Sequence, residues 1–481
     1  MTENLLKFVT VEKQMPDKRD AAVRRGDFRE IFGAYETQAA AEQAGRCSQC
    51  GVPFCQTHCP LHNNIPDWLM LTAEGRLEEA YEAASATNNM PEICGRICPQ
   101  DRLCEGNCVI ERAGHGTVTI GAVEKYITDT AWDKGWVKPP RPPRERDQSV
   151  GIVGGGPAGL AAAEELRRKG YQVHVYDRYD RMGGLLIYGI PNFKLEKPVV
   201  ERRTKLLEEG GGVVYHRNFE VGAEATLEDL RERHEAVLIA TGAYAERDMA
   251  APGIGLSNIV TAMTYLTASD RHVLGDQVPE FDNGTLNAAG KHVVVVGGGD
   301  TAMDCVRTAV RQGAKSVKCL YRRNRANMPG SRREVSHAEE EGVEFVWLSA
   351  PEAFLGNGAV SAVRAVRTRL GLPDTTGRQT PEPIQGSSFT LDAELVMKAL
   401  GFDPEDIPGL FGCPELEVTP RGTIKVDPKT RMTNIDGVFA AGDIIRGASL
   451  VVWAIRDGRD AAQSMDAYLK AKAEAPLAMA S

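Results

Sequence analysis

Eight cysteines near the start of the chain have the spacing of metal ligands. They run Cys47-x2-Cys50-x4-Cys55-x3-Cys59-Pro and then Cys94-x3-Cys98-Pro-x4-Cys104-x3-Cys108. In a reducing compartment such a group is more often a metal or redox site than a set of structural disulfides. Structural zinc sites favour two close pairs of ligands, and only Cys47 and Cys50 form a CxxC pair. Eight thiolates in two sets of four are better suited to two 4Fe–4S clusters.

The division of the eight thiolates is predicted by analogy with two-cluster ferredoxins, in which the last cysteine of a run binds the other cluster. A similar crossing here assigns one cluster to Cys47, Cys50, Cys55 and Cys108. The other cluster takes Cys59, Cys94, Cys98 and Cys104. The remaining cysteines, Cys305, Cys319 and Cys413, are expected to be small buried hydrophobic residues.

Two glycine-rich turns each follow an apolar strand pattern and open a helix pattern. The first contains Gly154, Gly156 and Gly159, and the second contains Gly297, Gly299 and Ala302. Glycines at these places let the backbone approach a pyrophosphate, whose charge then lies at the amino end of the following helix. The repeat therefore predicts two Rossmann-like dinucleotide-binding domains.

The residue that ends the second strand of each unit indicates which dinucleotide the unit binds. In the first unit Asp177 would accept hydrogen bonds from a ribose hydroxyl and repel a 2′-phosphate, which suits FAD or NAD. The second unit has Arg322 and Arg323 at this place, and arginine forks bind phosphate dianions. The second unit should therefore prefer NADPH. The alternative is a solvated basic turn with no ligand.

Two further motifs lie on either side of the second unit. The strand pattern of residues 237–240 ends in Thr241-Gly242, and a later strand pattern ends in Gly442-Asp443. With these motifs the sequence resembles the two-dinucleotide flavoprotein reductases. The resemblance implies that both motifs serve the FAD site. There Asp443 would bond the ribityl chain, and the following helix would direct its positive end at the flavin.

The predicted cofactors are FAD, NADPH and two 4Fe–4S clusters. NADPH delivers two electrons as hydride, a cluster accepts one, and a flavin can do both, so FAD converts between them. We therefore expect no catalytic side chain, because the flavin carries the hydride transfer. Gly183 and Gly184, soon after Asp177, are expected to pass close to the flavin.

The predicted fold is α/β, with an NADPH domain inserted into an FAD domain and a mainly helical iron–sulfur domain before both. The helical domain should span 1–145 and end in the proline-rich linker that follows residue 137. The FAD domain is expected at 146–255 and 403–481, and the NADPH domain at 256–402. Alternating strand and helix patterns after the linker indicate parallel sheets.

Composition excludes several classes of function. The chain has 481 residues and a formal net charge of -9, without a basic run that could neutralise a nucleic-acid backbone. Apolar runs are far shorter than the roughly 20 residues that span a bilayer. The first residues resemble neither a signal peptide nor a transit peptide. We expect a cytoplasmic protein with no nucleic-acid or membrane partner.

Taken together, these motifs resemble the small (beta) subunits of bacterial NADPH-dependent glutamate synthases over essentially the whole chain. The cysteine module also resembles the N-terminal part of dihydropyrimidine dehydrogenase. The first resemblance implies a large (alpha) FMN-containing partner subunit, which makes glutamate from glutamine and 2-oxoglutarate. The second leaves open an electron-input role in another complex.

Two other classes of protein are less compatible with the motifs. A disulfide reductase would need a redox CxxC beside the flavin, and none occurs after Cys108. A non-enzymatic assembly module with structural clusters would not need an arginine-lined coenzyme site.

Overall fold

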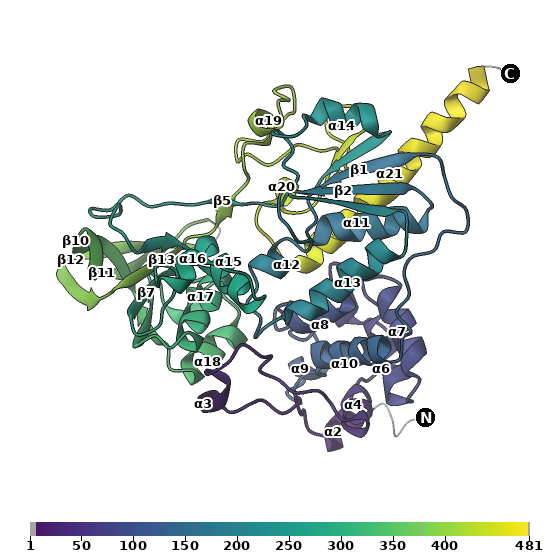
Figure 1. Ribbon diagram of the computed structural model, residues 1–481. Helices are drawn as coiled ribbons and strands as arrows, with labels where there is room; N and C mark the ends of the chain where they lie inside the picture. The colour runs from purple at the N-terminus through teal and green to yellow at the C-terminus, as the bar shows by residue number, and fades with distance from the viewer. Residues whose placement is uncertain (1–5, 376, 480–481) are drawn as a thin grey trace.

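The chain folds into a helical part and two α/β units. The computed structural model describes residues 6–375 and 377–479. In Figure 1 the helical part lies below the first α/β unit, and the second unit extends to the left of both. The predicted α/β class, with a helical domain in front, is therefore confirmed. Within the described ranges, no helix has both the length and the apolarity to cross a bilayer.

Short helices make up the part that carries the eight cysteines. They are α2 (Lys7–Thr10), α3 (Ala21–Arg24), α4 (Thr37–Ala44), α5 (Phe54–Thr57), α6 (Ile65–Ala73), α7 (Leu77–Ser85), α8 (Pro91–Ile97), α9 (Val109–Arg112) and α10 (Ile120–Asp133). Trp68 of α6 packs with apolar residues of α10 to form their core. The buried Arg46 guanidinium donates to the carbonyls of Val11 and Thr117, which connects the segment after α2 to the segment before α10.

A five-stranded parallel sheet forms the first α/β unit. Its order is β15 (Val438–Ala440), β4 (Ala236–Ile239), β1 (Ser149–Val153), β2 (Gln172–Asp177) and β3 (Val213–Arg217). Its helices are α11 (Pro157–Arg168), α12 (Leu185–Tyr188), α13 (Lys197–Glu209), α14 (Leu227–Arg233), α19 (Ile407–Leu410), α20 (Asp443–Arg446) and α21 (Val451–Met479). The first and last segments of this unit meet where α11 crosses α21. A Cβ at Gly458 would overlap the carbonyl oxygen of Ala158 there, so only glycine allows the crossing.

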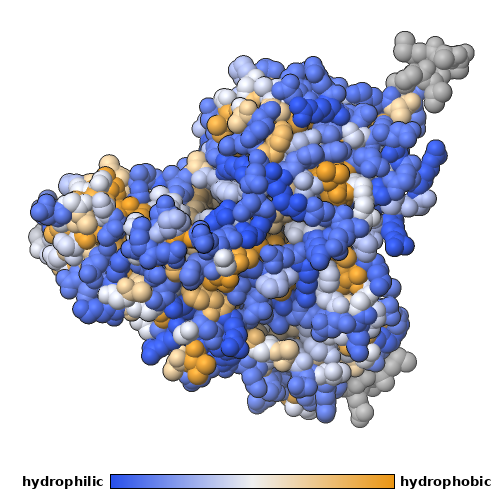
Figure 2. All heavy atoms as spheres, viewed as in Figure 1, coloured by the Kyte–Doolittle hydropathy of each residue, from blue (hydrophilic) through white to orange (hydrophobic). Residues whose placement is uncertain are grey.

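The second unit contains another parallel sheet and an outer antiparallel sheet. The parallel order is β6 (Ile259–Thr261), β13 (Leu395–Ala399), β7 (His292–Gly297), β8 (Ser316–Tyr321) and β9 (Glu344–Trp347). Its main helices are α15 (Ala262–Val273), α16 (Pro279–Asp282), α17 (Asp300–Arg311) and α18 (Arg332–Glu340). The outer sheet is β10 (Ser349–Asn357), β11 (Ala359–Pro373) and β12 (Gln379–Asp392), which the sequence analysis did not predict. Leu372 on this sheet is 92% exposed, and orange patches mark that end of the molecule in Figure 2.

The second unit is joined to the first by two short strands. β5 (Ala245–Glu246) leaves the first unit and β14 (Phe402–Asp403) returns to it, and the two pair antiparallel. All of β6 to β13 lies between them in the chain. The orientation of the second unit therefore depends on non-covalent contacts with its neighbours.

Candidate functional site

Four of the eight cysteines surround one small cavity in the helical part. Its lining includes Cys47, Cys50, Cys55 and Cys108 among apolar residues of α5, α6 and α9. Burial raises the pKa of Cys47 to about 11 and that of Cys55 to about 12. Such thiols are protonated at neutral pH unless a metal holds the thiolate. The donor set fits a thiolate-bound cluster, and it is the set that the ferredoxin analogy assigns to one cluster.

Three of the other four cysteines, Cys59, Cys94 and Cys98, lie where the helical part meets the first α/β unit, and Cys104 packs against the core of the helical part. A hydrogen bond with Cys94, together with burial, raises the pKa of Cys98 well above its ordinary value. Burial raises the pKa of Cys104 in the same way and that of Cys59 to about 11. Cys94 and Cys98 share one apolar core with residues of α12 and α21. The second set is therefore built into the border with the first unit.

Glu124 of α10 is an acidic group beside the second set that sequence reasoning missed. Its buried carboxylate accepts hydrogen bonds from Asn63 (3.2 Å) and Asn88 (3.4 Å). Burial raises its pKa to about 8, and its charge helps to raise the pKa of Cys59 and Cys98. Its spacing from the cysteines carries no motif that could have identified it. In the described part of the chain, no three or more His, Cys, Asp or Glu side chains are arranged as a single-ion site.

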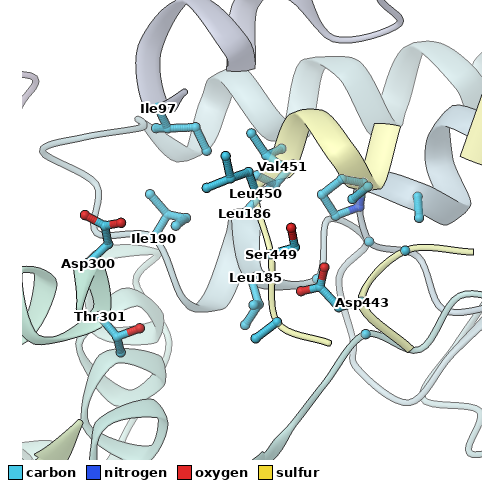
Figure 3. A pocket seen from close by; sticks show the side chains of 18 of the residues that line it. Ile97, Leu185, Leu186, Ile190, Asp300, Thr301, Asp443, Ser449, Leu450 and Val451 are labelled. Carbon is cyan, nitrogen blue, oxygen red and sulfur yellow. The ribbon is translucent and has the colours of Figure 1, made fainter. Parts of the chain in front are cut away.

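A cavity of about 410 Å³ lies between the two α/β units and the helical part. Its lining includes eight residues predicted for the FAD site: Gly154, Gly156, Asp177, Gly184, Thr241, Gly242, Gly442 and Asp443. Gly159 and Gly183, also predicted, do not line it. Figure 3 shows Asp443 and Ser449 on one side of the cavity and Asp300 and Thr301 of the second unit on the other. Apolar side chains, among them Leu186 and Leu450, lie between these polar ends.

The three glycines of the first loop have different structural roles. A Cβ at Gly159 would overlap the carbonyl oxygen of Gly154, so the third glycine allows α11 to pack on β1. Gly154 has φ +108° and lies against the carbonyl of Ala240. A Cβ at Gly156, in contrast, has no protein atom closer than 3.9 Å. The space above Gly156 therefore belongs to the cavity.

Both glycine loops lead into helices whose amino ends lack a side-chain cap. Gly156 precedes α11 and Gly299 precedes α17, and neither helix has a side-chain hydrogen bond at its first amides. Uncapped amides at a helix start are a binding site for anions such as pyrophosphate. Both loops therefore fit a dinucleotide.

Three polar groups of the first unit suit a flavin nucleotide. Asp177 accepts hydrogen bonds from the amides of Gly155 (2.7 Å) and Tyr179 (2.9 Å), which hold its carboxylate at the edge of the loop. The buried Thr241 hydroxyl has no hydrogen-bond partner within the described chain. Burial raises the pKa of Asp443 to about 6, so its carboxyl can donate or accept a hydrogen bond near neutral pH. The following helix starts at Val451, and Leu450 and Val451 line the cavity.

The second loop repeats this geometry beside two arginines. Gly297 lies against the carbonyl of Ala399, Gly299 has open space at its Cβ, and Ala302 is buried. Arg322 is exposed and Arg323 half-buried. Within the residues described, neither forms a salt bridge, so both guanidinium groups can bind a phosphate. Neither arginine lines the large cavity; its second-unit lining comes from α17 and α18.

The cavity brings all three parts of the chain together. Ile97 (Figure 3) and Cys98 line it from the helical part, so the second cysteine set borders the space beside the first glycine loop. Lys194 of the first unit and Asp304 of α17 form a buried ion pair of 2.8 Å on the same lining. Sequence patterns could not reveal this pair because its members belong to different units.

Comparisons with known proteins find one family in the helical part and another across both α/β units. Residues 24–136 match the family described as dihydropyrimidine dehydrogenase domain II, 4Fe-4S cluster, and residues 148–458 match pyridine nucleotide-disulphide oxidoreductase. The chain is 70% identical over 478 residues to a glutamate synthase [NADPH] small chain from Azospirillum brasilense, covering 99% of each. It is 42% identical to the small chain of Escherichia coli K12, covering 98% of this chain and 100% of that one.

Solved structures support the fold of the two α/β units. Mycobacterium tuberculosis FprA in complex with NADPH aligns with a TM-score of 0.58 at 19% identity. The alignment covers 69% of this chain and 86% of FprA.

The middle glycine of each loop can test which unit holds which nucleotide. Gly156→Val should leave the protein folded, because a Cβ there has no protein atom closer than 3.9 Å, but it should lower flavin content at least about tenfold by filling the cradle. Gly299→Val is the matched control, since a Cβ there has no protein atom within 4 Å; it should keep the flavin and weaken NADPH binding. Flavin absorbance per chain and NADPH titration measure both effects. Normal flavin content in Gly156→Val would contradict the placement.

Proposed function

The chain belongs to the family of NADPH-dependent glutamate synthase small chains, and we propose that it is the electron-input subunit of such an enzyme. It oxidises NADPH and passes the electrons, through FAD and two 4Fe–4S clusters, to a large FMN-containing subunit. That partner makes glutamate from glutamine and 2-oxoglutarate. One observation carries the proposal: a single cavity is bordered by the first glycine loop, by the start of α17 and by Cys98.

We infer three domains and their ligands. The iron–sulfur domain takes 1–145, the FAD domain 146–255 and 403–481, and the NADPH domain 256–402. The FAD ligands are Gly154, Gly156, Gly159, Asp177, Gly183, Gly184, Thr241, Gly242, Gly442 and Asp443. The NADPH ligands are Gly297, Gly299, Ala302, Arg322 and Arg323. The clusters take the two sets of four cysteines defined above.

The side chains of the cavity bind and orient the two nucleotides, and the cofactors supply the redox chemistry. Bound FAD supplies the conversion of a two-electron hydride into single electrons, and the clusters supply one-electron carriers. Asp177 selects a ribose without a 2′-phosphate at the first loop, whereas Arg322 and Arg323 select one with it at the second. The apolar walls formed by Leu186 and Leu450 exclude water from the space between the two nucleotides.

The cavity lining favours a relay of electrons over disulfide chemistry. Among its described residues the only cysteine is Cys98, which belongs to the second set. Cys305, Cys319 and Cys413 are buried, as expected, and none of them lines the cavity. A thiol pair that could form a disulfide beside the flavin is thus missing from the described lining.

The division of labour between two subunits gives the first test. The isolated chain should oxidise NADPH with an artificial dye but form glutamate from glutamine and 2-oxoglutarate only after a large subunit is added. Dye reduction and glutamate formation are measured on the same preparation. Glutamate formed by this chain alone, free of copurified protein, would overturn the proposal.

The arginine pair gives a test of coenzyme choice. Arg322→Ala with Arg323→Ala should weaken the use of NADPH by about tenfold to a hundredfold, because a charged phosphate contact contributes roughly 1.5–3 kcal/mol. The use of NADH, which lacks the 2′-phosphate, should change little. The ratio of kcat/KM for the two coenzymes measures the effect. An equal loss of kcat/KM with NADPH and with NADH would contradict the assignment of the two arginines.

Metal analysis tests the cysteine assignment. Protein purified without oxygen should contain about eight irons per chain, as two 4Fe–4S clusters require. Cys50→Ala should lower this to about four, because one set of ligands is incomplete. Cys319→Ala is the control, since Cys319 lies in β8 away from both sets. Zinc in place of iron would refute the assignment.

A further inference from the structure

A loop of the iron–sulfur domain lies between the two dinucleotide units. It comprises residues 15–33, closed by backbone pairing of Lys18 with Phe32. On one side Asn192 of the first unit donates to the carbonyl of Phe28 (2.7 Å). On the other side the Phe32 ring contacts His337 of α18, with centroids 5.7 Å apart. The loop also lines the large cavity through Met15 and Phe32.

Arg24 joins this loop to the end of α18. Its side chain is fully buried; Nε lies 2.9 Å from Glu341 Oε1 and Nη2 lies 2.6 Å from Glu340 Oε2. Lys18 of the same loop also pairs with Glu340, at 2.8 Å. In Figure 1, α3, which ends at Arg24, lies directly below α18. The iron–sulfur domain is thus bonded to the NADPH unit at this glutamate pair, in addition to the hydrogen bonds that Arg333 donates to Gln100 (2.8 Å) and Ser331 donates to Asp101 (3.4 Å).

The same glutamate pair is connected to the first unit and to the cavity. Glu341 accepts hydrogen bonds from Arg307 (2.9 Å) and Arg311 (2.6 Å) of α17. Both guanidinium groups lie over the ring of Phe193, at 4.6 Å and 3.8 Å. The next residue after Phe193 is Lys194, whose partner is Asp304 of α17 on the cavity wall. Arg24 therefore acts on the helix that begins at the coenzyme loop.

The opposite border of the NADPH unit is held by other ion pairs. Arg181 pairs with Asp276 (2.7 Å), and Lys197 pairs with Asp270 (3.1 Å). These contacts join α15 and the chain after it to the first unit. Because the covalent connection is only the β5–β14 ribbon, the unit needs contacts at both borders to keep one orientation. At the border with the iron–sulfur domain, Arg24 is the buried cation that contacts both glutamates, and the exposed Lys18 pairs with Glu340 alone.

We propose that Arg24 is a positioning residue for hydride transfer, holding the NADPH unit so that the start of α17 faces the flavin cavity. The inference rests on the proposed function. Without Arg24 the unit should occupy additional orientations in which the coenzyme does not reach the flavin, so the fraction in the competent state falls. The NADPH contacts themselves, at Gly299 and Arg322, remain unchanged.

The substitution should spare the fold of the NADPH unit. After Arg24→Gln, Glu341 keeps its bonds to Arg307 and Arg311, so no buried charge is left without a partner. Glu340→Gln removes the contact from the other side; 35% of that side chain is exposed, and its ion pairs are with Arg24 and Lys18 of the loop. The two variants therefore weaken the same border from opposite sides, and both remove the Arg24–Glu340 pair.

The test is anaerobic rapid mixing of the complete flavin- and iron-loaded chain with NADPH. The limiting rate of flavin reduction should fall about tenfold in Arg24→Gln and several-fold in Glu340→Gln, while the Kd for NADPH stays within about twofold. Arg24→Lys should recover part of the rate. The double variant should lose less than the product of the single losses, because the Arg24–Glu340 pair is removed by both substitutions. Arg364→Gln is the matched control: it removes an exposed pair with Glu352 on the outer sheet of the same unit.

The outcomes separate this inference from the proposed function. Unchanged limiting rates in both variants, with full flavin and iron content, overturn the role of Arg24. If Arg24→Gln loses flavin or iron, the limiting rate of Glu340→Gln serves as the test instead, and an unchanged rate in that variant overturns the role of Arg24. A loss that appears entirely in the Kd for NADPH also overturns it, since the role is one of orientation. Failure of the unmodified chain to reduce its flavin with NADPH would instead refute the proposed function.

Discussion

The second α/β unit is joined to the rest of the chain only by a short two-stranded ribbon. Its orientation toward the cavity therefore depends on the ion pairs at its border with the iron–sulfur domain. The β5–β14 ribbon has two residues in each strand. Buried charges such as Glu341 are costly unless they are paired and hydrogen-bonded. Bonds from Arg307 and Arg311 outweigh the burial of Glu341 and lower its pKa to about 2. The carboxylate therefore stays charged and can accept the hydrogen bond that Arg24 donates across the border.

The cavity between the units is lined by the helical part and by both α/β units, which explains why one chain contains all three. The first glycine loop, the start of α17 and Cys98 border the same space. A two-electron donor and a one-electron carrier can therefore lie on either side of one flavin without a moving domain between them. The first cysteine set lies farther along the helical part, around its own small cavity. Of the eight cysteines, Cys98 of the second set is thus the one that lines the cavity between the units, whereas the first set lines the small cavity of the helical part.

Local spacing allowed much of this site to be predicted, whereas contacts between distant residues could not be. The cysteine runs, the glycine loops and Asp443 are recognisable because the chemistry requires particular residue types at short separations. Spacing alone does not distinguish Gly156, which faces the cavity, from Gly159, which allows helix packing. The difference depends on which carbonyl group lies near each Cα in the fold. Arg24 and Glu124 belong to no motif. Their roles arise only when the fold brings together residues such as Arg24 and Glu341, which are 317 positions apart.

The position of the residue 15–33 loop has a consequence for biosynthesis. The loop and both cysteine sets leave the ribosome first, but Glu340 and Glu341 follow only after some tens of seconds at usual rates of synthesis. The last cover over the second set arrives later still, because Arg456 of α21 donates to the carbonyl of Pro60 (2.9 Å). The order of synthesis therefore places the second set of cysteines in the chain before the segments that cover them in the folded protein.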